Sequence, residues 1–500
     1  MENLLTNDIV KQKYANYEYL KENKINPYPS DIKKDIMAEE LRKKYKSLGQ
    51  EEISEKQYWV AGRMVALRGH GKTAFGHIED FSGKIQFYGR KDELGEEFFE
   101  IFRKVDLGDF IAVKGNVFRT KTGEITIRMK EFKLVSKSIQ PMPEKFHGVK
   151  DVELRYRRRY VDLIANSEVK DIFIKRSLII QKIREFMSNR DFLEVETPMM
   201  HTIAGGAAAR PFTTHHNTLD MDLYLRIAPE LYLKRLLVGG FEKVYEINRN
   251  FRNEGISIKH NPEFTMMEVY QAYADYNDMM DLTEDIFNHI AIEVCGSEEI
   301  EYQGEKLSFK KPFARLTMVE SIEKHANIKL DESMEQEDIF EIAKSNGIGS
   351  AEKSMSRGEL INLIFEEKVE EKLIQPVFIY KYPVEISPLS KNNEKEPRYV
   401  DRFEIFAYGR EMGNAFSELN DPFEQEKRFL EQISKRSDGD EEAHRMDKDY
   451  VLALQYGMPN AGGLGLGIDR MIMLFTDSSS IRDVILFPTL RPNKEEENKS

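Results

Sequence analysis

The sequence predicts an α+β protein in which a small β-barrel precedes a larger domain of helices and strands. Three observations support this prediction. The chain has 500 residues, more than one hydrophobic core usually serves, so two or three domains are expected. Five short strand-like runs and one helical run fall within residues 57–134, separated by turn residues. A Pro-Met-Pro linker at 141–143 and a long amphipathic helical pattern then follow.

Residues 1–55 are expected to form a helical extension. Helix-forming residues dominate this stretch, and the segment Asn26-Pro27-Tyr28-Pro29 interrupts it. Lysine and arginine are frequent between residues 33 and 46. We therefore expect a helical extension that is broken at this segment and is basic after it.

Residues 56–140 carry the barrel prediction. The runs are strands at 58–65, 73–80 and 84–90, a helix at 93–105, and strands at 109–119 and 124–134. Three strands, a helix and two strands in so short a segment resemble an OB-fold. That fold is a small barrel with a face that binds single-stranded nucleic acid.

The larger domain is expected to span residues 156–491, after a linker at 141–155. Its first long helix carries an apolar stripe of Val169, Ile172, Ile179, Ile183 and Phe186. Residues 331–374 look like a helical insertion between strands. The polar tail, 492–500, is expected to be disordered.

Charge is distributed unevenly along the chain. The net charge is −13, yet residues 1–150 hold 28 Lys and Arg against 23 Asp and Glu, and positions 151–500 hold 46 against 64. A basic segment joined to an acidic body fits a nucleic-acid-binding arm on a catalytic domain. An ordinary solvated surface would explain the excess equally well, so charge alone leaves both interpretations open.

Composition excludes several classes of protein. Cys295 is the only cysteine, which excludes an internal disulfide and a cysteine-based zinc site. No apolar run approaches the ~20 residues of a membrane helix, so no membrane association is expected. The first residues lack the pattern of a signal or transit peptide, and we expect a cytoplasmic location.

One segment suggests a ligand platform from physical chemistry alone. Residues 250–254 and 260–270 read as two strands of a hairpin with a loop near 255–259. Because side chains alternate along a strand, Arg252 and Glu254 should share one face, as should Phe264, Glu268 and Tyr270. Arginine can grip a carboxylate or phosphate with two hydrogen bonds, and an aromatic ring can stack on a base. A solvated hairpin with scattered charges is the equally plausible alternative for this segment alone.

Three segments in order resemble motifs 1, 2 and 3 of the class II aminoacyl-tRNA synthetases. They are Phe192–Pro198, the hairpin segment from Asn250 to Glu268, and the glycine-rich run Gly463–Arg470. The glycines of the third do not fit a G-x-G-x-x-G phosphate loop, and no Gly-Lys-Ser/Thr follows them. The resemblance implies a catalytic domain with an antiparallel sheet flanked by helices. It also implies that ATP activates a carboxylic acid for transfer to tRNA.

The same resemblance implies the residues that handle ATP. Arg252 and Arg470 would be catalytic, the first on the reacting carboxylate and α-phosphate and the second on adenine and the γ-phosphate. The full ATP-binding set would be Arg252, Glu254, His260, Asn261, Phe264 and Arg470.

Glu404 and Glu411 are the candidate metal ligands. A turn near Tyr408-Gly409 would bring these two carboxylates together, and two carboxylates repel unless a cation or proton lies between them. Mg²⁺ on the ATP phosphates is the natural occupant, and the family places it there. Pairing of each glutamate with Arg402 or Arg410 is the alternative.

Segments 225–235 and 413–419 resemble those of lysyl-tRNA synthetases of the bacterial type, and the likeness covers nearly the whole chain. This implies a lysine–tRNA ligase that forms lysyl-adenylate, loads tRNA and releases AMP and pyrophosphate. A buried cluster of carboxylates needs positive charge, which lysine supplies twice. By resemblance, Glu418 and Tyr270 hold the ε-ammonium and Glu230 and Gly206 the α-ammonium. The complete lysine-binding set is Gly206, Glu230, Glu268, Tyr270, Asn414, Phe416 and Glu418.

The barrel is expected to bind the anticodon of the tRNA. By resemblance, Phe75 would stack on a base, Gln86 would hydrogen bond to one, and Arg68 would support the backbone. A place for Phe75 in the barrel core is nearly as plausible from sequence. Motif 1 builds a dimer interface in this family, so a homodimer is implied.

Two other functions compete with this one. A related ligase that attaches lysine to a protein would lack the barrel, so residues 57–134 argue against it. A non-catalytic single-strand-binding protein would leave the larger domain and its three motifs unexplained.

Overall fold

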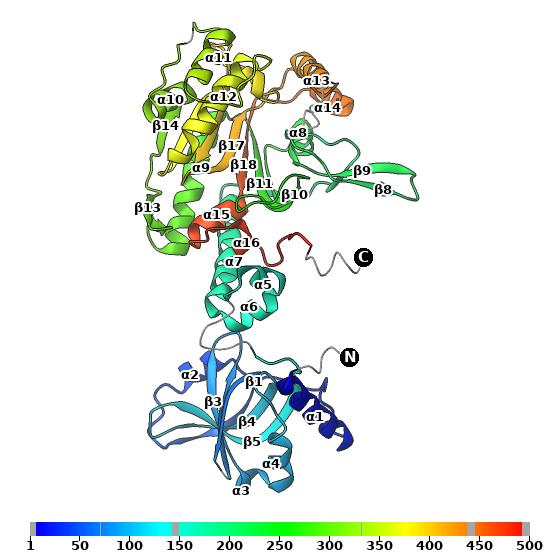
Figure 1. The fold of residues 1–500 in the computed structure, drawn as a ribbon, viewed down its shortest axis with the longest axis vertical. Coiled ribbons are helices and arrows are strands. Elements are labelled where there is room, and N and C mark those ends of the chain that lie inside the picture. The colour runs from blue at the N-terminus through cyan, green and yellow to red at the C-terminus, as the bar shows by residue number, and fades with distance from the viewer. Residues whose placement is uncertain (1–6, 71, 143–149, 332, 438–445, 493–500) are drawn as a thin grey trace. The chain divides into compact units, whose positions relative to one another are not determined.

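The computed structural model describes residues 7–70, 72–142, 150–331, 333–437 and 446–492 (Figure 1). It divides into two compact units, Met1–Gly148 and Val149–Ser500, which are described separately. Residues 493–500 of the predicted tail and 143–149 of the predicted linker lie outside the described residues. No helix in the described ranges is both long enough and apolar enough to cross a membrane.

The first unit is a closed five-stranded barrel with the strand order β1-β2-β3-β5-β4, which confirms the predicted barrel. Its strands are β1 (Ile53–His70), β2 (Thr73–Glu79), β3 (Lys84–Arg90), β4 (Phe110–Arg119) and β5 (Ile125–Ser136). Two helices precede it, α1 (Asp8–Glu22) and α2 (Ala38–Lys44), on either side of the predicted proline break. Alternate side chains such as Val60, Ile78, Phe87, Val113 and Ile127 fill the interior.

The single helix predicted at 93–105 is wrong in detail, because two short helices occur there. They are α3 (Lys91–Leu94) and α4 (Glu96–Phe102). Gly95 separates them with a φ of 86°, a conformation that a right-handed helix cannot contain.

The second unit is built on an eight-stranded sheet with the order β14-β15-β16-β17-β18-β11-β10-β6. All neighbours are antiparallel except the outer pairs β14–β15 and β10–β6. This confirms the predicted antiparallel sheet with flanking helices. The strands are β6 (Leu193–Glu194), β10 (Lys243–Phe251), β11 (Glu263–Ala272), β14 (Ala314–Thr317), β15 (Val377–Pro383), β16 (Tyr399–Phe406), β17 (Glu411–Ser417) and β18 (Ala461–Gly467).

The strand predicted at 192–198 is much shorter than expected. Only Leu193 and Glu194 pair with β10, as the edge of the sheet. Beyond them, Thr197 Oγ1 donates to Glu246 Oε2 at 2.6 Å, and Pro198 has no N–H to donate. The segment therefore leaves the ladder after two paired residues and is anchored by a side chain.

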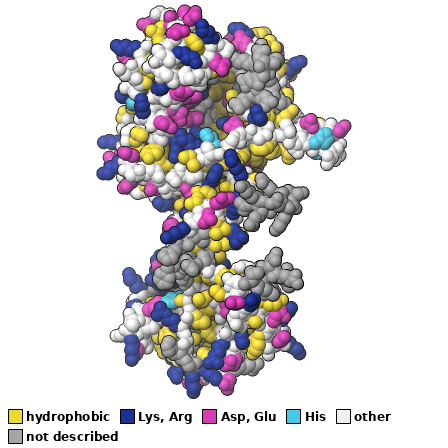
Figure 2. Space-filling view, in the orientation of Figure 1, with side chains coloured by type: hydrophobic (Ala, Val, Ile, Leu, Met, Phe, Trp, Pro, Cys, Tyr) yellow, Lys and Arg dark blue, Asp and Glu magenta, His cyan; other side chains and the backbone are white. Residues whose placement is uncertain are grey.

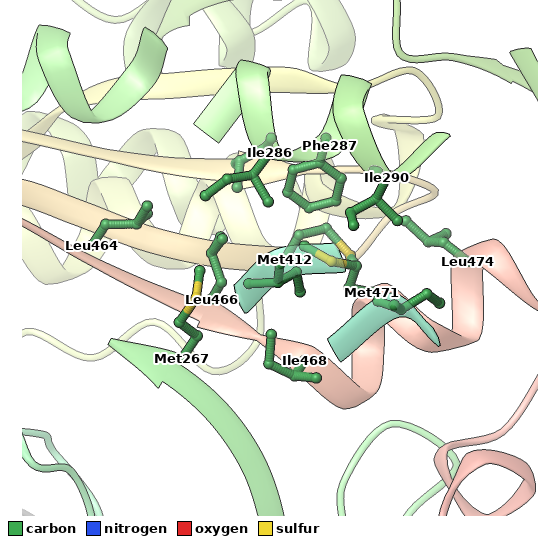
Figure 3. Packing of buried hydrophobic residues seen from close by; sticks show 14 of the residues in the cluster. Met267, Ile286, Phe287, Ile290, Met412, Leu464, Leu466, Ile468, Met471 and Leu474 are labelled. Atoms are coloured by element: carbon green, nitrogen blue, oxygen red, sulfur yellow. The ribbon is translucent and has the colours of Figure 1, made fainter. Parts of the chain in front are cut away.

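Three helices cover one face of this sheet. They are α7 (Ser167–Ser188), α9 (Tyr276–Ile290) and α15 (Ile468–Phe475), and the first confirms the predicted long amphipathic helix. In Figure 3, Leu464 and Leu466 of β18 lie in the core below Ile286, Phe287 and Ile290 of α9, and Met267 of β11 and Ile468 of α15 belong to the same cluster. The main core of the unit thus lies on one side of the strands, which leaves their other side for a site.

Helices connect the parallel strands β14, at the edge of the sheet, and β15 beside it. They are α10 (Met318–Ala326), α11 (Gln336–Ser345) and α12 (Arg357–Lys368), and the last two fall within the predicted insertion 331–374. A parallel pair requires such a crossover, because a tight turn can join only antiparallel neighbours. This connection has its own buried core, which includes Ile339, Leu360 and Ile364.

The remaining elements are short. A three-stranded sheet in the order β7-β9-β8 projects from the unit in Figure 1, and every residue of β8 is exposed. The other elements are α5 (Val152–Arg157), α6 (Arg159–Ala165), β7 (Met200–His201), β8 (Thr213–His216), β9 (Met221–Leu225), α8 (Glu230–Val238), η2 (Ala291–Cys295), β12 (Glu299–Tyr302), β13 (Glu305–Ser308), η3 (Glu370–Lys372), η4 (Val384–Ile386), α13 (Pro422–Ser437), α14 (Lys448–Gln455) and α16 (Ile481–Val484).

Candidate active site

A pocket of about 520 Å³ lies on the sheet face opposite the main core. Side-chain alternation on β11 produces this division: Met267 and Val269 enter the core, whereas Met266, Glu268 and Tyr270 line the pocket. Figure 2 shows the larger unit hollowed, with acidic and basic side chains gathered around the hollow. The pocket is therefore large enough for a small-molecule substrate, and its walls combine charged and apolar side chains.

The predicted hairpin forms, but it ends earlier than expected. Asn250 of β10 pairs with Phe264 of β11, and the ladder stops soon after. The N–H of Arg252 still donates to the carbonyl of Pro262 at 2.9 Å, but Pro262 has no N–H to return the bond. Arg252 and Glu254 therefore do not share a strand face as predicted. Both still line the pocket, from the loop.

Arg252 combines a buried guanidinium with an unused hydrogen-bond donor. Its guanidinium lies over the Phe264 ring, 5.1 Å from the ring centre. Its Nε is buried without a hydrogen-bond partner among the described residues. Burial lowers the pKa of Arg252, and the charge of Glu254 opposes this effect. A buried guanidinium with a free donor is suited to an anionic ligand.

Arg470 on α15 connects two other segments of the site. It donates to the backbone oxygen of Glu411 at 2.5 Å and lies 3.1 Å from His260 Nε2. Burial lowers the pKa of His260, and the charge of Arg470 adds to the decrease. A neutral His260 can accept this hydrogen bond, so the pair brings two of the predicted ATP residues into contact.

Asn261 lies in the same loop and lines the pocket, but its side chain is occupied. Its Nδ2 donates to the Glu263 carbonyl at 2.6 Å, and its Oδ1 accepts from the Thr489 N–H at 3.3 Å. These contacts indicate that Asn261 holds the loop in place.

Glu404 and Glu411 both line the pocket and interact with each other. Burial raises the pKa of Glu404 to about 7; Arg402 opposes this increase, and the charge of Glu411 adds to it. Each also has an arginine partner: Glu404 pairs with Arg402 at 2.5 Å and Glu411 with Arg470 at 3.3 Å. Within the described ranges, no cluster of three or more His, Cys, Asp or Glu forms a metal cage. Two carboxylates that repel each other at one pocket still fit a cation such as Mg²⁺, which would take its other ligands from the phosphates of a bound nucleotide.

A second group of carboxylates lies deeper in the pocket. Glu230 begins α8, and Glu268 lies on β11 with Tyr270 O–H donating to its Oε2 at 3.1 Å. Burial raises the pKa of Glu268 to about 8, and the negative charge of Glu230 adds to the increase. Gly206 lines the wall beside Glu230. This end of the pocket therefore attracts positive charge.

Glu418 lies directly behind Gly463 of β18. A side chain at Gly463 would begin 1.8 Å from Glu418 Oε1, so the two are in close contact. Neither oxygen of Glu418 accepts a hydrogen bond from the described residues, but Oε2 forms an ion pair with Lys234, whereas Oε1 has no such partner. Phe416 and Asn414 complete the wall, and Asn414 Oδ1 accepts from Arg402 Nε at 2.9 Å.

Sequence reasoning missed Lys234 and the role of Arg402. Lys234 follows Glu230 by four positions in a helix, and its Nζ donates to Glu230 Oε1 at 2.6 Å. The i,i+4 spacing was the available signal. Nothing in the sequence places Arg402 against Asn414, since their contact depends on the register between β16 and β17.

The predicted anticodon residues lie on the outer surface of the barrel. Phe75 is 39% exposed and lies 4.4 Å from the ring of Tyr88, so the alternative that it fills the core is wrong. Arg68 is exposed and lies opposite Phe75 in the ladder. Gln86 is fixed by Glu124 and Thr126, both at 2.8 Å. Tyr88, which the sequence did not single out, extends the aromatic surface on β3.

Comparisons with known proteins match both units. A family model described as class II tRNA synthetases (D, K and N) matches residues 151–491. A second, described as an OB-fold nucleic acid binding domain, matches residues 58–135.

Curated relatives match along nearly the whole chain. A lysine–tRNA ligase of Carboxydothermus hydrogenoformans is 56% identical over 492 residues, which cover 98% of this chain and 100% of the relative. One from Syntrophomonas wolfei is 55% identical, covering 95% of this chain and 96% of the relative. One from Staphylococcus aureus is 52% identical, covering 93% and 95%.

Proposed function

Because the chain belongs to the class II tRNA synthetases of the D, K and N group, we propose that it is a lysine–tRNA ligase. It activates lysine with ATP and transfers the lysyl group to tRNA. The buried carboxylates at one end of the pocket carry this proposal, together with full-length relatives that are lysine–tRNA ligases.

The charge of the pocket favours lysine over aspartate or asparagine. Glu230, Glu268 and Glu418 are each buried, and a buried anionic cluster is costly without cations. Lysine brings an α-ammonium and an ε-ammonium. An aspartate side chain would add a further negative charge to this cluster, which makes it a poor substrate.

Each end of the substrate has a partner in this proposal. We place the ε-ammonium at Glu418 and Tyr270 and the α-ammonium at Glu230 and Gly206. Asn414 and Phe416 border the aliphatic chain. The substrate carboxylate then faces Arg252, whose Nε lacks a partner among the described residues. One substrate thus satisfies groups at both ends of the pocket.

The reaction proceeds by positioning rather than by covalent attachment to the enzyme. A carboxylate oxygen of lysine attacks the α-phosphorus of ATP, and the bond to pyrophosphate breaks as lysyl-adenylate forms. Arg252 holds the carboxylate and α-phosphate in line, while Glu254 and Phe264 bind the adenine. His260 and Arg470 retain the departing phosphates, with Asn261 holding their loop.

In the second step, the 3′-terminal hydroxyl of tRNA attacks the activated carbonyl carbon. The bond between that carbon and the phosphate oxygen of AMP breaks, so AMP leaves and the tRNA carries an ester. None of the described pocket side chains is in an evident position to act as a general base for this step.

Mg²⁺ belongs to the proposal as a cofactor. Glu404 and Glu411 would hold it, and it would neutralise charge on the ATP phosphates. Their mutual repulsion at the pocket wall supports this assignment.

The partners follow from the two units. The barrel would bind the tRNA anticodon through Phe75, Gln86 and Arg68. We also propose a homodimer, because the short edge strand β6 exposes Leu193 and the nearby Met200. A cytoplasmic location completes the proposal, since translation consumes charged tRNA there.

Exchange of labelled pyrophosphate into ATP tests this function directly. With Mg²⁺, the purified protein should catalyse exchange that depends on lysine and not on aspartate or asparagine. Arg252→Ala should abolish exchange while the protein keeps its far-ultraviolet circular dichroism spectrum. Exchange driven by another amino acid, with lysine inactive, would refute the pocket assignment.

A further inference from the structure

Lys234 is a buried cation that belongs to no step of the proposed reaction. It lies one helical turn after Glu230 on α8 and has no exposed area. Its Nζ donates to Glu230 Oε1 at 2.6 Å and forms an ion pair with Glu418 Oε2. One ammonium therefore connects the two carboxylates to which the two ends of the substrate are assigned.

The position of Lys234 prevents direct contact with a ligand. Glu230 borders the pocket, whereas the Lys234 side chain is fully buried behind it, with its Nζ 5.3 Å from the Phe416 ring centre. Burial acts to lower the pKa of Lys234, but the charges of Glu230 and Glu418 outweigh this effect and raise it. The ammonium thus stays charged and acts through its two partners.

An ordinary structural ion pair would leave its carboxylates fully satisfied. Glu418 is not satisfied, because its Oε1 has no hydrogen-bond donor among the described residues and lies against Gly463, a pocket residue. Lys234 therefore fixes one oxygen of Glu418 and leaves the other for a donor that enters from the pocket.

We propose that Lys234 is a positioning residue that fixes the spacing of Glu230 and Glu418, and that this spacing selects lysine by its length. The inference rests on the proposed function. Because both carboxylates are tied to one ammonium, neither can move to follow a shorter substrate. Ornithine, a diamine shorter by one methylene, can reach one carboxylate but not both.

Removal of the Lys234 charge should weaken the binding of lysine but leave the rate of the chemical step nearly unchanged. In Lys234→Met, the two carboxylates lose their shared cation, and one takes up a proton or moves. We expect the KM for lysine in pyrophosphate exchange to rise about tenfold or more. The KM for ATP and the kcat at saturating lysine should change less than about threefold, because Arg252 and Arg470 are untouched.

Discrimination provides the second measurement. The ratio of kcat/KM for lysine to that for ornithine should fall about tenfold. A factor of this size is expected when a pocket no longer discriminates between substrates that differ by one methylene. Lys234→Arg keeps a cation at this position and should recover most of the lysine KM. Each variant is first compared with the parent protein by melting temperature, and Lys234→Gln replaces the methionine variant if the latter does not fold.

Lys137 offers a matched control. It is also a buried lysine joined to two carboxylates, Asp106 and Asp109, but it lies in the barrel unit. Lys137→Met should leave the lysine KM of exchange unchanged.

The outcomes distinguish the two proposals. A parent protein that does not exchange with lysine refutes the proposed function. A parent protein that does, with Lys234→Met retaining both the lysine KM and the lysine-to-ornithine ratio, overturns only the role of Lys234. Equal losses for lysine and ATP would make Lys234 merely structural and would overturn it too.

Discussion

At the scale of single residues, the pocket depends on the absence of a side chain at Gly463. Gly463 lies between the pocket and Glu418, and a methyl group there would begin 1.8 Å from Glu418 Oε1 and 2.7 Å from Tyr270 Cε1. Glu418 cannot easily move away, because Lys234 holds its other oxygen. The glycine therefore leaves room for a buried carboxylate directly behind the wall of the pocket.

Gly463→Ala should raise the KM for lysine in pyrophosphate exchange by about tenfold or more. Overpacking at such a site costs roughly 1–3 kcal/mol, and here the displaced groups are those assigned to the substrate ammonium. Gly349→Ala is the control, since no heavy atom lies within 4 Å of the side chain that it would add. An unchanged KM in Gly463→Ala would show that Glu418 does not contact the substrate.

The raised pKa of Glu268 predicts that the binding of lysine depends on pH. Burial raises its pKa to about 8 with help from Glu230, while Tyr270 and Arg226 oppose the increase. The group is thus largely protonated at pH 6.5 and ionised at pH 9, and only the ionised form attracts an ammonium. We expect kcat/KM for lysine to rise over this range with a midpoint near pH 8. Glu268→Gln should remove this midpoint, and a parent profile flat from pH 6.5 to 9 would contradict the assignment.

The same group affects the stability of the ligand-free protein. Its pKa in the folded state, about 8, exceeds its ordinary value of 4.5, so the folded state binds the extra proton between these values. The Glu268 contribution to the free energy of unfolding must therefore fall as pH rises from 4.5 to 8. Denaturant titrations at pH 5.5 and 7.5 should show a smaller decrease for Glu268→Gln than for the parent protein.

The sequence predicted the residues of the site better than their connections. Arg252 and Arg470 follow from the motifs and Glu268 also from strand alternation, which are local properties. The ion pair between Lys234 and Glu418 Oε2 does not, because it joins α8 to the residue after β17, which lies far along the chain. Such a contact depends on tertiary packing, which local pattern does not specify.

At the scale of elements, strand register explains most of the successes and failures. The barrel strands were predictable because each alternates apolar and polar residues between turn signals. The end of β10 was not, because it lies opposite Pro262, which has no N–H to return the bond from Arg252. The shortness of β6 was not either, because its pairing with β10 is set by tertiary packing. Gly95, which separates α3 from α4, was a signal in the sequence for two helices in place of the single one expected.

The outer face of β2 and β3 yields a prediction about tRNA. Phe75→Ala should lower kcat/KM for tRNA charging by roughly 5- to 150-fold, since stacking is worth about 1–3 kcal/mol per base. It should leave pyrophosphate exchange intact, because Phe75 is an exposed barrel residue and exchange takes place at the other unit. Tyr456→Ala, which removes an 81% exposed ring from the larger unit, serves as the control. Unchanged charging in Phe75→Ala would remove this ring from the anticodon surface.

At the scale of the whole molecule, each of the two units has hydrophobic clusters of its own. The barrel cluster draws its buried residues from positions 20–134, and the buried clusters of the larger unit lie beyond position 178. The number of domains was predictable from length and from the proline-containing linker.

Ligands should therefore stabilise one unit more than the other. We expect two transitions in differential scanning calorimetry. Lysine with ATP at about 100 times their dissociation constants should stabilise the larger unit by about 2.7 kcal/mol per ligand, a shift of a few degrees. The transition of the barrel should not move. Equal shifts of both transitions would contradict independent cores.

The order of strands in the sheet has a consequence for synthesis on the ribosome. β18 pairs with β11, so Gly465 lies beside Glu268, which is made much earlier. At about 5–20 residues per second, a nascent chain waits roughly ten seconds or more between these strands, with the edge of β11 unpaired. The barrel unit is complete by Gly148 and can fold long before this. We therefore expect the amino-terminal unit to fold during translation, whereas the pocket forms only when β18 has emerged.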